Sequence, residues 1–339
     1  MKGQLCASNP VKKEKYIVMK RYTAVLVILS VFTMLASGQS AKSYYKAGEK
    51  FFEVKQYEDA ILQYTKAVDL DPEYNKAYVR RAETYEKMDQ YAEAAADYER
   101  ALVFMSKDEE VNYKAGKAYF KNGELGKALG KLNEAVSRKS NYLEAYQVRT
   151  QVYLGLNRYD DALEDCKKSL RLRENEVNFY NLGQVYEKLE LFPEAQDAYQ
   201  KSIRKNNNVV DSHFALALLS YNNQKLDMAM ASVNNVVRIN PRHKDGLMLR
   251  AQIYARQMLL SKAVDDISIA LNMFKDDPQL YVLRGDFYQS LSRHSDALID
   301  YSNALEIDDS NAEVYYKRAG SYEFIRNYED AMTDYEKLL

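Results

Sequence analysis

Small and aromatic residues recur along this chain at helical spacing, as pairs of apolar stripes that a short polar segment separates. The first such unit spans residues 41–74, and its apolar positions are Tyr44, Ala47, Gly48, Phe51, Ala60, Tyr64 and Ala67. Residues three or four positions apart share one face of a helix. Pro72 ends the second stripe, because proline lacks an N–H group and restricts the residue before it. The pattern predicts two antiparallel helices that touch through small residues.

The same unit recurs to the end of the chain. Its nine copies are spaced by 34 residues, or by 33 in one case, and begin at residues 41, 75, 109, 143, 176, 210, 244, 278 and 312. Every copy has alanine at the start of the second stripe: Ala60, Ala94, Ala128, Ala162, Ala195, Ala229, Ala263, Ala297 and Ala331. A period of this length predicts an all-α solenoid over residues 41–339. The last copy ends at Leu339 before its second helix is complete, so we expect the natural chain to continue or something to dock there.

A large aromatic residue, a small pair and a second aromatic, followed by Ala, aromatic, Ala and often Pro, form a known repeat signature. In these positions the chain resembles the tetratricopeptide repeat family over residues 41–339. The resemblance implies a right-handed superhelical solenoid of antiparallel helix pairs, with nine units of which the last is incomplete. It also implies a concave groove lined mainly by the first helix of each pair, and a scaffold that binds peptides or proteins without catalysis.

Residues 1–38 have the three parts of a secretory signal. A basic lead of Lys12, Lys13, Lys15, Lys20 and Arg21 precedes an uncharged run over residues 22–35, and Ala36, Ser37 and Gly38 follow. The run has 14 residues, whereas a comfortable membrane span needs ~20. We therefore expect cleavage after Gly38; the alternative is an uncleaved anchor that holds the protein at a membrane. The start of translation is open between Met1 and Met19.

The nine copies are of two kinds. Five copies have arginine before the small residue of the first helix and aspartate before the inward residue of the second helix, whereas the other four lack both. The five sets are Arg81 and Asp97, Arg149 and Asp165, Arg250 and Asp266, Arg284 and Asp300, and Arg318 and Asp334. A partly buried guanidinium needs a carboxylate partner, so we expect these residues to pair across the helix interface. The alternative is that they mark two ancestral repeat types that were duplicated.

The four copies without the arginine have an aromatic residue at the fifth position of the first helix, and three add another about two turns later. These residues are Tyr45, Phe52, Tyr113, Phe120, Tyr180, Phe214 and Tyr221. The family resemblance implies that both positions face the concave groove, which would make them candidate partner-binding residues. The alternative is that the rings pack between neighbouring helices.

Composition and motifs give no sign of other chemistry. The 48 basic and 49 acidic residues are interspersed, which is typical of solvated helix faces and argues against nucleic-acid binding. The run from Gly126 to Lys131 has the wrong spacing for a phosphate-binding loop, and His213, His243 and His294 are scattered. We expect no catalytic residue, metal, cofactor or small-molecule substrate. Cys166 takes an inward position and is interpreted as a buried core thiol.

Together these features predict a non-enzymatic scaffold for protein–protein interaction, exported to the periplasm or cell envelope of a Gram-negative bacterium. The tyrosine-rich composition and the short signal resemble exported repeat proteins of the Bacteroides type. The set of residues that grips the acidic C-terminus of cytosolic chaperones is absent, because Tyr45 and Glu49 stand at its first two positions. The alternatives are a secretory-pathway co-chaperone that binds unfolded clients, and the interaction module of a larger protein with a downstream functional domain.

Overall fold

The computed structural model describes residues 40–338. The predicted signal peptide or anchor and Cys6 lie outside these residues. Within the described part the chain is all-α, with eighteen helices and no strand. It forms two compact units, which divide between Leu156 and Asn157. No helix in the described range is long and apolar enough to cross a membrane.

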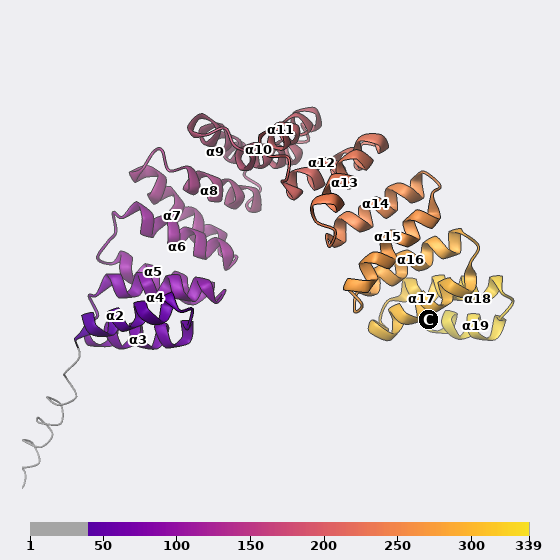
Figure 1. The fold of residues 1–339 in the computed structure, drawn as a ribbon, viewed down its shortest axis with the longest axis horizontal. Helices are drawn as coiled ribbons and strands as arrows, with labels where there is room; N and C mark the ends of the chain where they lie inside the picture. Colours follow the sequence, from indigo (N-terminus) through magenta and orange to yellow (C-terminus); the bar gives the residue numbers. More distant parts are fainter. Residues whose placement is uncertain (1–39, 339) are drawn as a thin grey trace, which may run out of the picture. The chain divides into compact units, whose positions relative to one another are not determined.

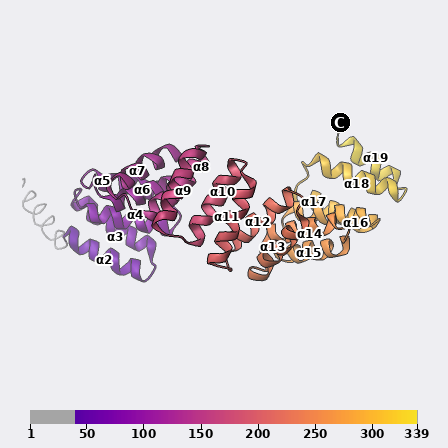
Figure 2. The same cartoon turned by 90° about the horizontal axis from the view of Figure 1, so that it is seen from above.

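The first unit is a stack of antiparallel helix pairs (Figures 1 and 2). Its helices are α2 (Ala41–Glu53), α3 (Tyr57–Leu70), α4 (Asn75–Lys87), α5 (Tyr91–Leu102), α6 (Glu109–Lys121), α7 (Leu125–Arg138) and α8 (Leu143–Gly155). The two helices of a pair pack on each other, and the second helix also packs on the first helix of the next pair. A buried core therefore runs from pair to pair through the unit.

The second unit repeats this arrangement. Its helices are α9 (Tyr159–Leu172), α10 (Glu176–Lys188), α11 (Phe192–Lys205), α12 (Val210–Asn222), α13 (Leu226–Ile239), α14 (Lys244–Arg256), α15 (Leu260–Met273), α16 (Pro278–Ser290), α17 (His294–Ile307), α18 (Ala312–Phe324) and α19 (Tyr328–Glu336). Along the chain, the first helices of the pairs begin 34 residues apart, or 33 in one case. The last helix, α19, has 9 residues and is shorter than the others.

Small residues allow the two helices of a pair to approach closely. The nine alanines that open the second stripes are all buried, Ala331 of the last pair included. On the facing helix, a Cβ atom at Gly48 would lie 2.6 Å from the Tyr64 ring, and one at Gly183 would lie 2.5 Å from the Tyr199 ring. Both rings are fully buried. The aromatic ring thus occupies the space that a larger residue on the first helix would need.

The turn inside each pair has one residue in the left-handed conformation, at the same place in all nine copies. Gly123 fills this place once; the other copies use Lys55, Asp89, Asn157, Glu190, Gln224, Met258, Ser292 and Arg326, with φ between 56° and 63°. In the first pair, the N–H of Gln56 donates to the carbonyl of Phe51, and that of Lys55 to the carbonyl of Phe52. These two bonds define a Schellman motif, which satisfies carbonyls at the end of the first helix.

Candidate functional site

Four of the five arginine and aspartate sets predicted from the sequence are in direct contact. Arg81 donates two hydrogen bonds to Asp97, each of 2.7 Å. Arg250, Arg284 and Arg318 make the same two-bond contact, with distances of 2.6–2.8 Å to Asp266, Asp300 and Asp334. Arg149 and Asp165 are both buried, but they belong to different units.

Each of these arginines also binds a polar residue of the preceding pair, a contact that is not among the predictions from the sequence. The Nη1 atom of Arg81 donates to Thr65, and that of Arg284 donates to Ser268, both on the second helix of the preceding pair. Arg149, Arg250 and Arg318 bind Asn133, Asn234 and Ser302 in the same way. The signal was a polar residue sixteen positions before each arginine. In the four copies with the direct contact, the arginine therefore joins three helices, and its donors are used inside the fold.

The aromatic residues predicted to line the groove are half-buried, and most of them contact another ring or a cation. Tyr45, Tyr113 and Phe214 contact the residue just before the next first helix, with 5.0–5.3 Å between ring centroids. Those contacts are with Tyr74, Tyr142 and His243, respectively. Tyr180 contacts Tyr199, at 5.9 Å.

Two of the later aromatic positions lie beside the first helix of the next copy. The Arg80 guanidinium lies 4.4 Å from the centroid of the Phe52 ring, and Arg256 lies 4.6 Å from that of Tyr221. Phe120 packs against the core cluster that runs from α4 to α8. Each ring thus has one side in a packing contact, and its remaining exposed part stays a candidate for partner binding.

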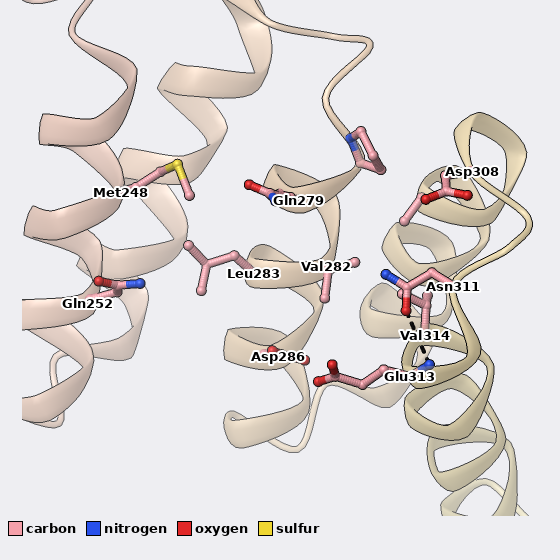
Figure 3. Close-up of a pocket in the computed structure, with 12 residues that line it drawn as sticks. Met248, Gln252, Gln279, Val282, Leu283, Asp286, Asp308, Asn311, Glu313 and Val314 are labelled. Atoms are coloured by element: carbon pink, nitrogen blue, oxygen red, sulfur yellow. Dashed lines mark hydrogen bonds between the residues drawn. The ribbon is translucent and has the colours of Figure 1, made fainter. Parts of the chain in front are cut away.

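The second unit contains a cavity of about 400 Å³ between α14, α16 and α18 (Figure 3). Its apolar floor consists of Met248, Val282, Leu283, Ala304 and Val314. Leu283 lies on the side of α16 toward Met248, and Val282 lies on the side toward Val314. The cavity belongs to copies of the arginine type, for which the sequence predicts no groove residue.

Polar side chains surround this apolar floor: Gln252, Gln279, Asp286, Asp308, Asn311 and Glu313. Asp286 accepts hydrogen bonds from the Tyr301 hydroxyl at 2.8 Å and from Lys317 at 2.9 Å. Lys317 also pairs with Glu313, at 2.9 Å. Hydrogen bonds from Ser310 lower the pKa of Asp308, and those from Lys317 lower the pKa of Glu313. Both carboxyl groups are therefore ionised at neutral pH.

A second cavity, of about 210 Å³, lies between α2, α4 and α6 in the first unit. Tyr45, Val79, Met105 and Val111 form its apolar part, so one predicted groove residue does line a cavity. Lys76, Arg80, Asp108, Glu110 and Lys114 provide its polar part. This cavity is the first-unit cavity, and the cavity between α14, α16 and α18 is the second-unit cavity.

The histidines and the cysteine have structural surroundings. The Nδ1 atom of His243 accepts from the N–H of Gly246 at 2.9 Å and caps α14. His213 is buried against the Asn207 carbonyl, and His294 is stacked on Phe324. Cys166 is buried. Over residues 40–338, no group of three or more His, Cys, Asp or Glu residues could hold a metal ion.

Helix pairs of this length, stacked in register with concave hollows between their first helices, define a helical-repeat protein of the scaffold class. Family models described as TPR repeat or tetratricopeptide repeat match residues 48–89, 113–176, 180–242 and 312–339, which together make up more than half of the chain. The chain belongs to the tetratricopeptide repeat family. Members of this family generally mediate protein–protein interaction, typically without catalysis.

Comparison with known proteins gives one curated relative and many similar structures. DnaJ homolog subfamily C member 3 of Gallus gallus is 22% identical over 210 residues, which are 56% of this chain and 42% of the relative. The chain therefore spans less than half of that relative's length. The Cut9-Hcn1 hetero-tetramer of the APC/C has a TM-score of 0.56 at 12% identity, covering 78% of this chain and 52% of that one.

A tetratricopeptide repeat protein from Parabacteroides merdae has a TM-score of 0.54 at 18% identity, covering 73% of this chain and 98% of that one. At these identities the two structural likenesses concern the fold alone.

Proposed function

We propose that this protein is a non-enzymatic scaffold that holds a segment of a partner protein against the first helices of its pairs. The observation that carries the proposal is the second-unit cavity, of about 400 Å³, with an apolar floor and a polar rim. A concave, mostly apolar surface with a few convergent polar groups is the usual form of a binding site. A cavity of this size holds one or two side chains of a peptide.

The rim of the cavity also suits a peptide backbone. Within residues 40–338, the side-chain amides of Gln252 and Gln279 make no hydrogen bond, and both line the cavity. An amide group can donate to a carbonyl and accept from an N–H, as an extended backbone requires. The half-buried rings at Tyr45 and Tyr113 provide further apolar surface on the first helices of the first unit.

We place this scaffold in the envelope of a Gram-negative bacterium, on the basis of the basic lead, the uncharged run and the small residues that end at Gly38. Expression of the full chain in such a host, followed by fractionation and N-terminal sequencing, tests the location. The proposal expects a periplasmic product that begins at Gln39. A cytoplasmic product with an intact N-terminus would contradict it.

A second candidate is a co-chaperone of the secretory pathway, which the likeness to a DnaJ homolog supports. Such a protein would bind unfolded clients along the same first helices. The test is suppression of aggregation of a reduced, unfolded model substrate by the purified chain. The purified chain should suppress aggregation at an equimolar concentration, and an added folded partner protein should not abolish this suppression. That result would favour the co-chaperone over the scaffold.

The scaffold proposal is tested by filling the cavity. Gln279 is exposed on α16 and lines the cavity, so Gln279→Trp should block it without disturbing the core. Ile299 is exposed on α17 and does not line the cavity, so Ile299→Trp is the matched control. In affinity capture from the envelope fraction, a partner retained by the wild-type chain and by Ile299→Trp should be lost from Gln279→Trp. Equal retention by all three proteins would contradict the proposal.

A further inference from the structure

The two cavities occupy the same place in the repeat. Tyr45, Val79 and Val111 of the first-unit cavity correspond, copy by copy, to Met248, Val282 and Val314 of the second-unit cavity. Each cavity thus keeps an apolar part at the same three positions. Other lining positions differ between the two cavities, and these differences bear on what each cavity would bind.

Three replacements make the lining of the second-unit cavity more acidic, and a fourth, from Asp108 to Asn311, removes one carboxylate. Lys76 corresponds to Gln279, Arg80 to Leu283, and Met105 to Asp308. The two cations Lys76 and Arg80 thus have no charged counterpart in the second-unit cavity, whereas Lys114 and Glu110 have theirs in Lys317 and Glu313. The second-unit cavity therefore has fewer cations beside its carboxylates than the first-unit cavity.

In the first unit, the protein's own cations balance the carboxylates. Arg80 binds both Glu49, at 2.7 Å, and Glu83. Lys114 lies 2.7 Å from Glu83 and 2.7 Å from Glu110. A chain of alternating charges thus crosses the first helices α2, α4 and α6. A bound cation would have to displace these contacts.

In the second unit this balance is missing. Lys317 is shared between Asp286 and Glu313. Asp308 accepts only from the backbone and hydroxyl of Ser310, and among residues 40–338 it makes no ion pair. The position that Arg80 occupies in the first unit is the apolar Leu283 here. The cavity therefore holds carboxylate charge beside an apolar floor, with one cation for three carboxylates.

We propose that the second-unit cavity binds a partner segment in which a lysine or arginine adjoins a large apolar side chain. This proposal rests on the proposed scaffold function and names the partner's chemistry. The apolar side chain would pack on Val282 and Val314, and the cation would take the place beside Asp308, on the same side of α16, that no cation of this chain fills. Charge complementarity of this kind sets specificity and speeds association. The first-unit cavity, with Lys76 and Arg80, disfavours the same segment.

The test is selection of a random nine-residue peptide display library on the full chain, followed by titration of the most enriched peptide as a synthetic probe. Four proteins are compared: wild type, Asp308→Lys, the neighbouring control Asp309→Lys, and Gln279→Trp. Asp309 is exposed and does not line the cavity. We expect enriched peptides with Lys or Arg next to an apolar residue, and binding that weakens about tenfold, or about 1.4 kcal/mol, in Asp308→Lys and not in Asp309→Lys.

The outcomes separate the partner's chemistry from the scaffold function. Enriched peptides that bind without a basic residue, equally well to Asp308→Lys, but are lost from Gln279→Trp, would overturn the charge preference and leave the scaffold function standing. Peptides that bind all four proteins equally, or no enrichment at all, would contradict the cavity as the binding site and the scaffold proposal with it. Loss of the expected binding in 0.5 M salt, as screening requires, would support the charge preference.

Discussion

At the residue scale, the close approach of paired helices depends on glycine at a few positions. A Cβ atom at Gly116 on α6 would lie 2.7 Å from the buried Leu132 and 3.2 Å from the carbonyl of Ala128. We therefore expect Gly116→Ala to lower the free energy of unfolding by about 1–3 kcal/mol, because overpacking outweighs the better helix propensity of alanine. Urea unfolding followed by circular dichroism measures the change.

Gly130 on the partner helix α7 is the control for this substitution. A Cβ atom there would meet nothing within 4 Å. Gly130→Ala should raise the free energy of unfolding by up to about 1 kcal/mol, since only the helix propensity changes. If both substitutions stabilise the protein, the close contact at Gly116 does not constrain the fold.

Glu86 on α4 is a half-buried carboxylate with poor partners. Its Oε1 atom has no hydrogen-bond partner in the described range, and Lys117 lies 3.9 Å away. Burial raises the pKa of Glu86 above its ordinary value of 4.5. The folded state therefore binds this proton more tightly than the unfolded state, so this group's contribution to stability falls as pH rises through the range above 4.5.

We expect Glu86→Gln to raise the free energy of unfolding at pH 7 by about 1 kcal/mol, and the gain to shrink as the pH is lowered toward 4.5. Glu83, one turn earlier on α4, is the control, because Arg80 and Lys114 both bind it. Glu83→Gln should destabilise the protein at pH 7. Denaturant titrations at several pH values give both curves, and a gain for Glu86→Gln that does not depend on pH would refute the assignment.

The residue contacts differ in how far the sequence could predict them. The arginine and aspartate sets change together across nine copies of one chain, and in four sets the two side chains are hydrogen-bonded. The sequence does not predict the acceptor sixteen positions before each arginine, because no single residue type recurs there: it is threonine, serine or asparagine, depending on the copy. The second-unit cavity was not predicted either, because its apolar lining is Met, Val and Leu rather than aromatic.

At the element scale, the arginine contacts join successive helices. Asp300 on α17 is buried and accepts two hydrogen bonds from Arg284 on α16. Asp300→Ala should lower the free energy of unfolding by about 3 kcal/mol, because it leaves a partly buried guanidinium without its carboxylate. Thermal or urea unfolding of the purified variant measures the loss.

An exposed pair at the start of the same helix provides the control. Arg293 and Asp296 lie 2.7 Å apart with both side chains exposed. Asp296→Ala should cost less than about 1 kcal/mol, since water solvates the arginine that remains. Equal losses for Asp300→Ala and Asp296→Ala would show that burial does not govern these contacts.

The elements themselves follow closely from the sequence, whereas the turns between them do not. Apolar stripes at helical spacing predict each helix pair, and Pro72 follows the end of α3 at Leu70. The left-handed residue in each turn is Gly only at Gly123; Asp89 and Asn157 also suit a turn, but residues such as Met258 and Arg326 carry no turn signal. The Schellman hydrogen bonds at the helix end impose that conformation against the residue's own preference.

At the scale of the whole molecule, one repeated element provides sites of different character. The helix pairs keep their buried alanines and their ring contacts, so each copy can change the exposed positions of its first helix independently. Lys76 and Arg80 line the first-unit cavity, and the residues at the same two positions in the second-unit cavity are Gln279 and Leu283. A repeat array can thereby present two binding chemistries without any change in its fold.

The central claim is that a partner occupies the second-unit cavity, and site-specific photo-crosslinking in living cells tests it most directly. A photoreactive phenylalanine analogue is placed at Gln279, inside the cavity, or at Ile299, which is exposed outside it. We predict a discrete covalent adduct from position 279 and none from position 299. Adducts of equal yield from both positions, or an adduct from position 299 alone, would contradict the claim.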